Sequence, residues 1–168
     1  DMPLSMYSAS IPALNHSLKR HATILRKASE HAASRNIAPG VLVNARLFPD
    51  MYALAKQVQI ATDQAKGCAA RLAGIEIPKF DDTETTFEEL QARIIKTIDF
   101  LDSVKAEQID GSEERDISFQ IHERKFEFKG KDYLISWVFP NFYFHATTAY
   151  NILRHNGIEL GKKDFLGG

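Results

Sequence analysis

The chain has one cysteine, no long apolar run and no glycine-rich phosphate motif, and each absence excludes a class of protein. Cys68 cannot form an internal disulfide, so the sequence is compatible with a reducing compartment. No window approaches the ~18 consecutive apolar residues of a membrane span. The N-terminal residues lack the basic region, apolar run and cleavage site of a secretory signal. We therefore expect a soluble, cytoplasmic protein without a membrane partner.

An excess of positive charge is also missing. The 21 Lys and Arg residues are offset by 22 Asp and Glu, which gives a net charge of −1. Nucleic-acid-binding proteins usually carry a basic stripe that displaces the counterions of the phosphates. Here the densest basic cluster, at 125–131, alternates with Glu127 and aromatic residues. We therefore expect no nucleic-acid partner.

The composition is that of one globular domain. The 168 residues are 44% hydrophobic and 26% charged, and single domains usually contain ~100–200 residues. No internal repeat or low-complexity stretch is present. We therefore expect residues 1–168 to form a single domain.

Hydrophobic periodicity predicts two helices in the first half. The first is expected over 12–35, with Ser10 as its cap, because the missing N–H of Pro12 has no partner in a first helical turn. The second is expected over 49–72, with Gly74 as its C-terminal cap.

The second half predicts two more helices and a hairpin. Thr86 and Glu89 form a capping-box pattern that begins the third helix. From Ile117 the period changes to two, which predicts a β-hairpin that turns at 122–124. The last helix is expected over 132–155, with a kink or a fresh start at Pro140. The fold class is therefore mainly α, a four-helix bundle with a short β-hairpin before the last helix.

Several segments resemble an uncharacterised family within the DinB/YfiT-like superfamily. They are LVNARL (42–47), PDM (49–51), QVQIATD (57–63), PNFYFH (140–145), ILRHNG (152–157) and the tail GK-x-DF (161–165). The resemblance extends from about Tyr7 to Gly167. It implies a four-helix bundle, often a homodimer, and it implies no settled reaction.

The wider superfamily often holds a divalent metal with three histidines, and some of those relatives are thiol-dependent transferases or isomerases. Two of the histidines form an H-x-x-x-H pair on the last helix. Among the six histidines here no two are three or four residues apart, so none forms that pair. His145 takes the place of the second histidine, Asn141 that of the first, and Gln57 is the nearest candidate for the third ligand. Amide oxygens are weak ligands for Zn²⁺ or Ni²⁺. We therefore predict that the metal site is degenerate and that the protein has no cofactor. Binding of a divalent metal is disfavoured, and it would use His145, Asn141 and Gln57.

The same motifs supply the other candidate residues of a pocket. His145 is the candidate catalytic group, as an acid, a base or a remnant ligand, and the alternative is a hydrogen-bonded core histidine. Thr148 shares the helical face of His145. Asn44, Arg46 and Asp50 lie before or within the start of the second helix. Arg46 can bind an anion or pair with a carboxylate, whereas the helix dipole alone explains Asp50.

Three functions remain open from the sequence. The first is a bundle that binds a small molecule in a pocket between the second and the last long helix. The second is a metal- or thiol-dependent enzyme of the transferase or isomerase type. The third is a non-catalytic, dimeric structural or interaction module.

Overall fold

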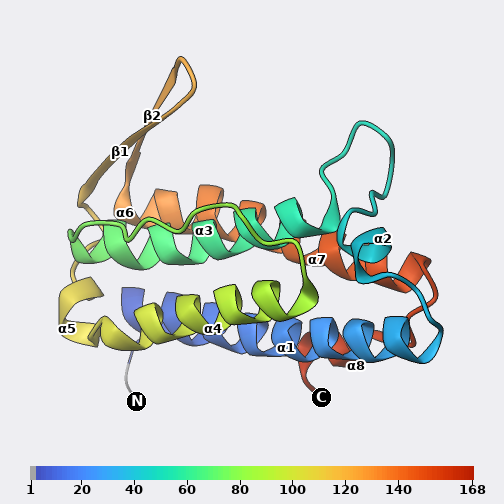
Figure 1. The fold of residues 1–168 in the computed structure, drawn as a ribbon. Coiled ribbons are helices and arrows are strands. Elements are labelled where there is room, and N and C mark those ends of the chain that lie inside the picture. Colours follow the sequence, from blue (N-terminus) through green and yellow to red (C-terminus); the bar gives the residue numbers. More distant parts are fainter. Residues whose placement is uncertain (1–2) are drawn as a thin grey trace.

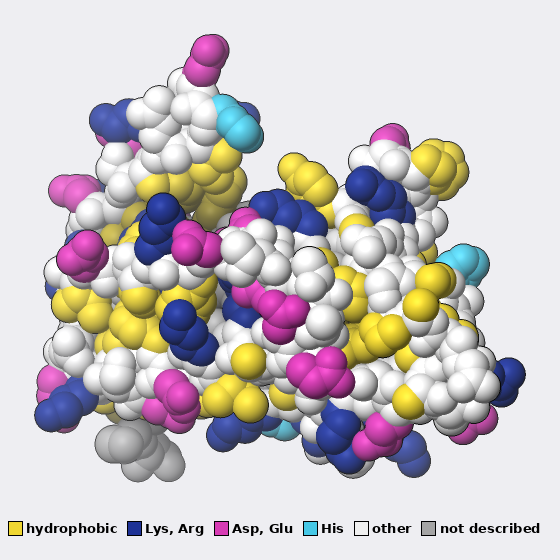
Figure 2. Space-filling model, viewed as in Figure 1, with side chains coloured by type: hydrophobic (Ala, Val, Ile, Leu, Met, Phe, Trp, Pro, Cys, Tyr) yellow, Lys and Arg dark blue, Asp and Glu magenta, His cyan; other side chains and the backbone are white. Residues whose placement is uncertain are grey.

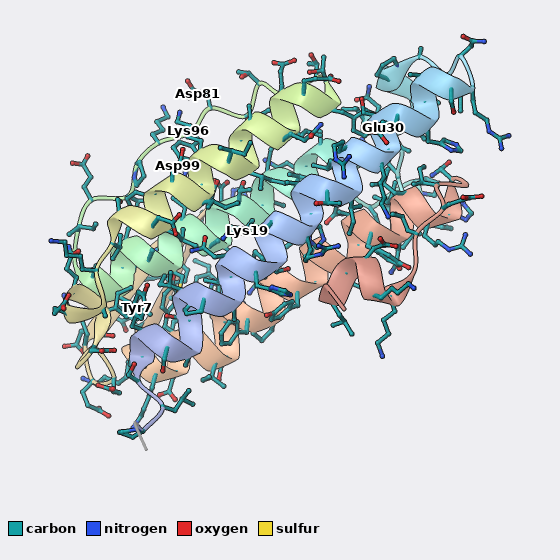
Figure 3. All side chains as sticks on the ribbon, turned by 90° about the horizontal axis from the view of Figure 1, so that it is seen from below. Tyr7, Lys19, Glu30, Asp81, Lys96 and Asp99 are labelled. Atoms are coloured by element: carbon teal, nitrogen blue, oxygen red, sulfur yellow. The ribbon has the colours of Figure 1, made fainter. Side chains whose placement is uncertain are left out.

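Four long helices form the body of the molecule, in a computed structural model that describes residues 3–168. They are α1 (Met6–Ser34), α3 (Leu54–Ala73), α4 (Phe87–Ser103) and α7 (Phe139–His155). α1 packs on α4 and α3 packs on α7, with α3 also against α4 (Figure 1). Figure 3, which views the bundle from below, shows α1 and α4 side by side. The predicted bundle of four helices with a hairpin is confirmed.

The first helix begins earlier than predicted. Ser5 is its N-cap: its Oγ accepts from the N–H of Ser8 at 3.1 Å, and the Ser8 Oγ accepts from the N–H of Ser5 at 2.8 Å. Ser10 is therefore not the cap; it lies inside α1 and donates to the carbonyl of Met6. The prediction was wrong because a reciprocal serine cap stabilises a start that precedes Pro12.

The second long helix begins later than predicted, at Leu54 rather than Pro49. Before it, Pro39 begins a short helix that was not predicted, α2 (Pro39–Val43), followed by an irregular connection. Arg46 Nη1 donates to the carbonyl of Met51 at 2.6 Å, a local bond that holds this connection outside the helix. The end of α3 at Gly74, with φ of 68°, is as predicted.

The start of α4 is confirmed, because Thr86 Oγ1 accepts from the N–H of Glu89 at 3.1 Å. The segment between α3 and α4, residues 75–86, runs back along the bundle (Figure 1). It is named the strap below. A short helix, α5 (Ala106–Ile109), follows α4.

The hairpin is also confirmed, with strands β1 (Asp116–Ile121) and β2 (Arg124–Lys129) antiparallel. Its aromatic face packs on Trp137, and Phe119, Phe126 and Phe128 have ring centroids 4.6–5.8 Å from the Trp137 ring. Figure 2 shows hydrophobic side chains gathered at the base of the hairpin. This contact supplies the packing that a lone hairpin lacks.

The last helical region changes its geometry before Pro140, as predicted. After the short α6 (Gly130–Asp132), Tyr133–Val138 form a π-helix, η1. A fresh α-helix, α7, then begins at Phe139 and carries Pro140 in its first turn. Because proline has no N–H, it loses no hydrogen bond in a first helical turn.

The chain ends in a short helix that was not predicted, α8 (Lys162–Leu166). It docks on α1, where Lys27 Nζ lies 2.6 Å from Asp164 Oδ1 and His16 Nε2 lies 2.6 Å from the carbonyl oxygen of Leu166. Across residues 3–168, no helix is long and apolar enough to cross a membrane.

Candidate functional site

A hydrogen bond between α3 and α7 joins two of the predicted site residues. His145 Nδ1 lies 2.7 Å from Gln57 Oε1, although the two residues are 88 positions apart. Gln57 is 1% exposed and His145 is half-buried. α3 and α7 pack along one another and bring the two side chains together.

The direction of this bond follows from a second one. Gln57 Nε2 donates to the backbone carbonyl of Tyr52 at 3.1 Å. Because a carbonyl only accepts, the amide nitrogen of Gln57 faces Tyr52 and the amide oxygen faces His145. His145 therefore donates through Nδ1–H, and in the neutral ring Nε2 keeps its lone pair. No hydrogen bond within residues 3–168 occupies that nitrogen.

The imidazole is held in its neutral form. Burial lowers the pKa of His145 below its usual value of 6.5, because desolvation disfavours the charged ring. The arrangement therefore presents a neutral base whose free nitrogen can accept a proton or a hydrogen bond.

One aromatic ring packs on this pair at the surface. The ring of Phe144 packs edge-on to the His145 ring with centroids 5.1 Å apart, and Phe144 is 56% exposed. Tyr52, whose backbone carbonyl anchors Gln57, is also 56% exposed.

The interior beneath the pair is nearly filled. A cavity of about 10 Å³ lies there, lined by Val58 and Ala61 of α3, Phe142 and Ala146 of α7, and His21 of α1 among others. A space of this size holds one water molecule at most. A larger ligand must therefore contact His145 from the surface.

A second histidine, His21, lies buried in the core. Its Nε2 lies 2.9 Å from the carbonyl oxygen of Ala146 and its Nδ1 lies 2.9 Å from that of Ser17. Burial lowers the pKa of His21, and the two carbonyl contacts raise it by less. The ring ties α1 to α7.

The remaining predicted residues are not brought to His145 by hydrogen bonds. Asn141 Nδ2 donates to the carbonyl of Trp137 at 2.8 Å, and Thr148 Oγ1 donates to that of Phe144 at 2.7 Å. Asn44 Nδ2 donates to the carbonyl of Gly40. Each polar group is thus satisfied within its own helix or turn.

Asp50 lies in an exposed bend of the connection before α3. Its predicted place in the first turn of a helix was wrong, because α3 begins only at Leu54.

The donor set does not fit a divalent metal. Gln57 and His145 bond to each other, so their donor atoms do not converge on one ion. The Asn141 amide is engaged with its own helix. In the described part of the chain, no group of three or more His, Cys, Asp or Glu side chains is placed to hold a metal ion. Histidine ligands of metals normally direct one ring nitrogen at the ion.

Sequence reasoning missed a charged cluster around Arg93 on α4. The Arg93 side chain is 2% exposed, and its guanidinium lies within 3.1 Å of carboxylate oxygens of Asp63, Asp82 and Glu84. Figure 2 shows acidic and basic side chains mixed over the middle of this face. The cluster fastens the strap to α3 and α4. The adjacent acidic residues of the strap were the available signal.

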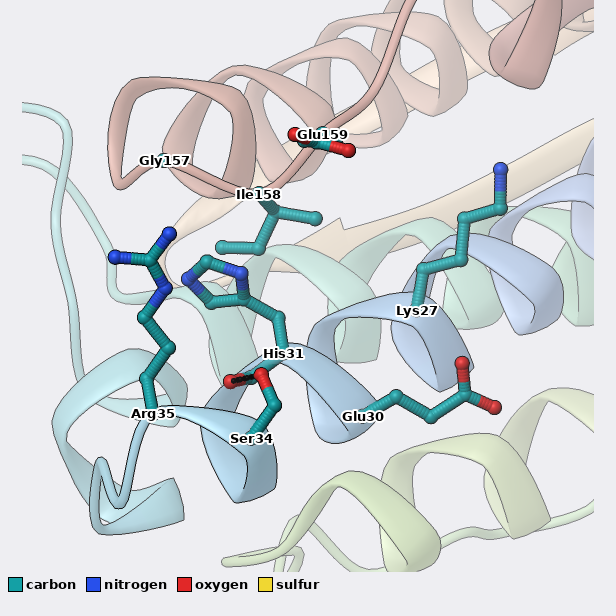
Figure 4. Close-up of a pocket in the computed structure, with 8 residues that line it drawn as sticks. All are labelled: Lys27, Glu30, His31, Ser34, Arg35, Gly157, Ile158 and Glu159. Atoms are coloured by element: carbon teal, nitrogen blue, oxygen red, sulfur yellow. Dashed lines mark hydrogen bonds between the residues drawn. The ribbon is translucent and has the colours of Figure 1, made fainter.

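A wider hollow of about 530 Å³ lies where α1 ends, opposite the turn that follows α7 (Figure 4). Lys27, His31 and Arg35 line one side, and Glu159 lies across from them. Its charges are mixed because Glu30 lines it as well, and its basic residues all belong to α1 or to Arg35, which caps that helix.

Comparisons with known proteins agree with this fold. The model of a family described as "Domain of unknown function (DUF1993)" matches residues 6–166. A crystal structure of a DinB family member protein from Shewanella denitrificans is 39% identical to this chain. The match covers 96% of this chain and 92% of that one, with a TM-score of 0.90. No curated protein matches the chain.

Proposed function

This chain belongs to the DUF1993 family of DinB-like proteins, and we propose that it binds a small molecule at the surface between α3 and α7. The observation that supports the proposal is the chain of bonds from Tyr52 through Gln57 to His145. It fixes one tautomer of a neutral imidazole and leaves Nε2 without a partner. A ligand with an O–H or N–H group would donate to that nitrogen.

The surroundings favour an uncharged ligand. The exposed ring of Phe144 beside His145 offers apolar contact, and the neutral imidazole offers one acceptor. Ring faces and edges pack well on planar ligands. The proposed ligand is therefore a neutral, partly apolar molecule with a hydrogen-bond donor.

A reaction at the same position is the second proposal, and it rests on the same free nitrogen. A general base must be neutral near the working pH and lie within hydrogen-bond reach of the proton it removes. His145 meets the first condition, because burial lowers its pKa. It would take a proton from the bound donor group, with Gln57 fixing the ring.

A fragment screen by ligand-observed NMR tests the binding proposal, with wild type beside His145→Ala and Gln57→Leu. Fragments that bind should lose at least about tenfold in affinity in His145→Ala. His155→Ala is the matched control, because His155 is an exposed residue of the same helix. Binding that survives in His145→Ala, or no fragment bound by wild type, would contradict the proposal.

A homodimeric interaction module is the remaining alternative. Besides Tyr52 and Phe144, Phe48 is 63% exposed, and exposed aromatic residues are enriched at protein interfaces. Sedimentation at micromolar concentration tests it. A dimer that dissociates in Phe144→Ser would support it, and a monomer throughout would remove it.

A further inference from the structure

A second surface, at the other end of α3, carries an inference that does not depend on His145. A groove of about 340 Å³ lies between α3 and the strap, lined by Asp63, Lys66, Gly67 and Arg71 and by residues 77–80. Gln57 and Arg71 are 14 positions apart on α3, which is ~21 Å along a helix at ~1.5 Å per residue.

The groove has more positive than negative charge. Lys66, Arg71 and Lys79 line it, whereas Asp63 is its single carboxylate. That carboxylate is shared already, because its Oδ1 lies 2.9 Å from Arg93 Nη2 and 3.3 Å from Lys66 Nζ. Lys79 Nζ lies 3.9 Å from Asp81 Oδ1, in an exposed pair that water screens. The positive charge at Lys66 and Arg71 is therefore incompletely neutralised.

At Lys66, too, the nearby negative charge does not offset the cost of burying the positive charge. Its side chain is 6% exposed, and its Nζ lies 4.1 Å from the centroid of the Phe80 ring. Burial lowers the pKa of Lys66, and the opposing effect of Asp63 is smaller. An anion in the groove would stabilise this ammonium group.

Arg71 is the residue with the least compensation. It is half-buried, and no carboxylate of residues 3–168 lies within 4.0 Å of its guanidinium. Nη1 donates to the Tyr133 hydroxyl at 3.0 Å, and the guanidinium lies over the Phe119 ring. A guanidinium removed from water is costly unless it is paired. Its place in the last turn of α3 suits the helix dipole, but the dipole does not require it to be half-buried.

Gly67 makes room for this arrangement. A Cβ at position 67 would lie 2.6 Å from Arg71 Nη1. A residue larger than glycine would therefore displace the guanidinium from its present position. The absence of a side chain at Gly67 is thus a requirement for the position of Arg71 beside the groove.

We propose that this groove binds a small organic anion, with its carboxylate or phosphate paired to Arg71 and its apolar group on the strap. Lys66 and Lys79 add positive charge, and Ile77, Pro78 and Phe80 supply the apolar wall. Guanidinium groups form paired hydrogen bonds with both kinds of anion. The site takes anions that combine charge with an apolar or aromatic group.

Four probes separate charge from apolar contact: phenyl phosphate, phenylacetate, inorganic phosphate and neutral 2-phenylethanol, each titrated by NMR of ¹⁵N-labelled protein. The two aromatic anions should bind and shift amide signals of residues 63–80. Inorganic phosphate should bind at least about tenfold more weakly, and 2-phenylethanol should leave the signals of residues 63–80 unshifted. Equal binding of the neutral probe at residues 63–80, equal binding of inorganic phosphate, or no anion bound there below about 10 mM overturns the proposal.

Two variants locate the site. Arg71→Gln and Gly67→Ala should each weaken the aromatic anions by about tenfold or more. Gly67→Ala keeps the fold, because Ala is the better helix former and only the end of a flexible side chain must move. Lys19→Gln, on the far helix α1 (Figure 3), removes one positive charge and should bind like wild type. Unchanged affinity in both Arg71→Gln and Gly67→Ala overturns the proposal.

Discussion

His145 donates its Nδ1–H to Gln57 Oε1 at 2.7 Å, across the interface of α3 and α7. Gln57 in turn donates to the carbonyl of Tyr52, two residues before the start of α3. A side chain on the last long helix is thus oriented by the backbone of the connection before α3. Substitutions in that connection should therefore change the orientation of the His145 ring, although the substituted residues do not contact it.

Stability should fall as the pH is lowered from about 7 to about 5.5, because burial lowers the pKa of His21 and His145 below 6.5. In this pH range the two histidines bind protons more readily in the unfolded chain than in the folded chain. The stabilisation is present above 6.5 and decreases as the pH falls below it, by up to about 1.4 kcal/mol per pH unit for His21. Urea unfolding measures this slope, which should shrink in His21→Leu but not in His155→Ala. A stability that stays constant or rises on acidification would contradict it.

Arg93→Met should lower the free energy of unfolding by about 3 kcal/mol. It leaves Glu84, whose side chain is 10% exposed, without its partner, while Asp63 and Asp82 still reach solvent. Chemical denaturation gives the value, and Lys19→Met is the exposed control.

The same cluster predicts a loss of stability in stronger acid. Burial raises the pKa of Glu84, but the hydrogen bond and charge of Arg93, together with hydrogen bonds from the backbone and from Gln59, lower it more, so the pKa lies below 4.5. This contribution is present above 4.5 and is lost as the pH falls through the lower, folded value. Acid unfolding of Arg93→Met should lack it. An identical acid transition in wild type and variant would disprove the role given to Arg93.

Gly130→Ala should destabilise the protein by about 1–3 kcal/mol, as overpacking does. A Cβ there would lie 1.9 Å from the backbone carbonyl oxygen of Ser112, which cannot move aside like a side chain. In Gly40→Ala the nearest atom, Asn44 Nδ2, lies 3.7 Å away. Because Ala is favoured over Gly in helices, Gly40→Ala should be neutral or stabilising. Thermal unfolding of the two variants compares their midpoints. Equal shifts of the midpoint would contradict the close approach of Gly130 to the Ser112 carbonyl.

Phe126→Ala should release the hairpin while the bundle stays folded. Trp137 is the one tryptophan of the chain, and the Phe126 ring lies 4.6 Å from it between centroids. Its fluorescence emission should therefore shift to longer wavelength, with circular dichroism at 222 nm nearly unchanged. Tyr143→Ala, a partly exposed aromatic position on α7, should leave the emission in place. An unshifted spectrum for Phe126→Ala would show that the hairpin does not depend on this contact.

The predictions from sequence succeeded where a local signal had one structural meaning. The Thr86 cap, the alternation after Ile117 and the disruption at Pro140 each correspond to an observed feature. They failed at Pro12 and Pro49, where a proline was taken as a helix start. The Ser5–Ser8 cap and the Arg46 bond to the Met51 carbonyl decide those boundaries.

The site was only partly accessible to sequence reasoning. His145 and Gln57 were selected through a resemblance, and the packing of α3 on α7 brings them together. The bond from Gln57 to the Tyr52 carbonyl has no sequence signature, because any residue supplies a carbonyl. The groove beside Arg71 could not be predicted, because one of its walls is the strap. The sequence of the strap has no periodic pattern that would indicate where it runs.

The most direct test of the account is the tautomer of His145, read from a long-range ¹H–¹⁵N spectrum of the histidine rings at about pH 7.5, above the usual histidine pKa. The signals of His145 are assigned by their loss in His145→Ala. We predict a neutral ring protonated at Nδ1, with the unprotonated nitrogen at Nε2, and a change of this pattern in Gln57→Leu. A ring protonated at Nε2, or a spectrum that Gln57→Leu leaves unchanged, would contradict it.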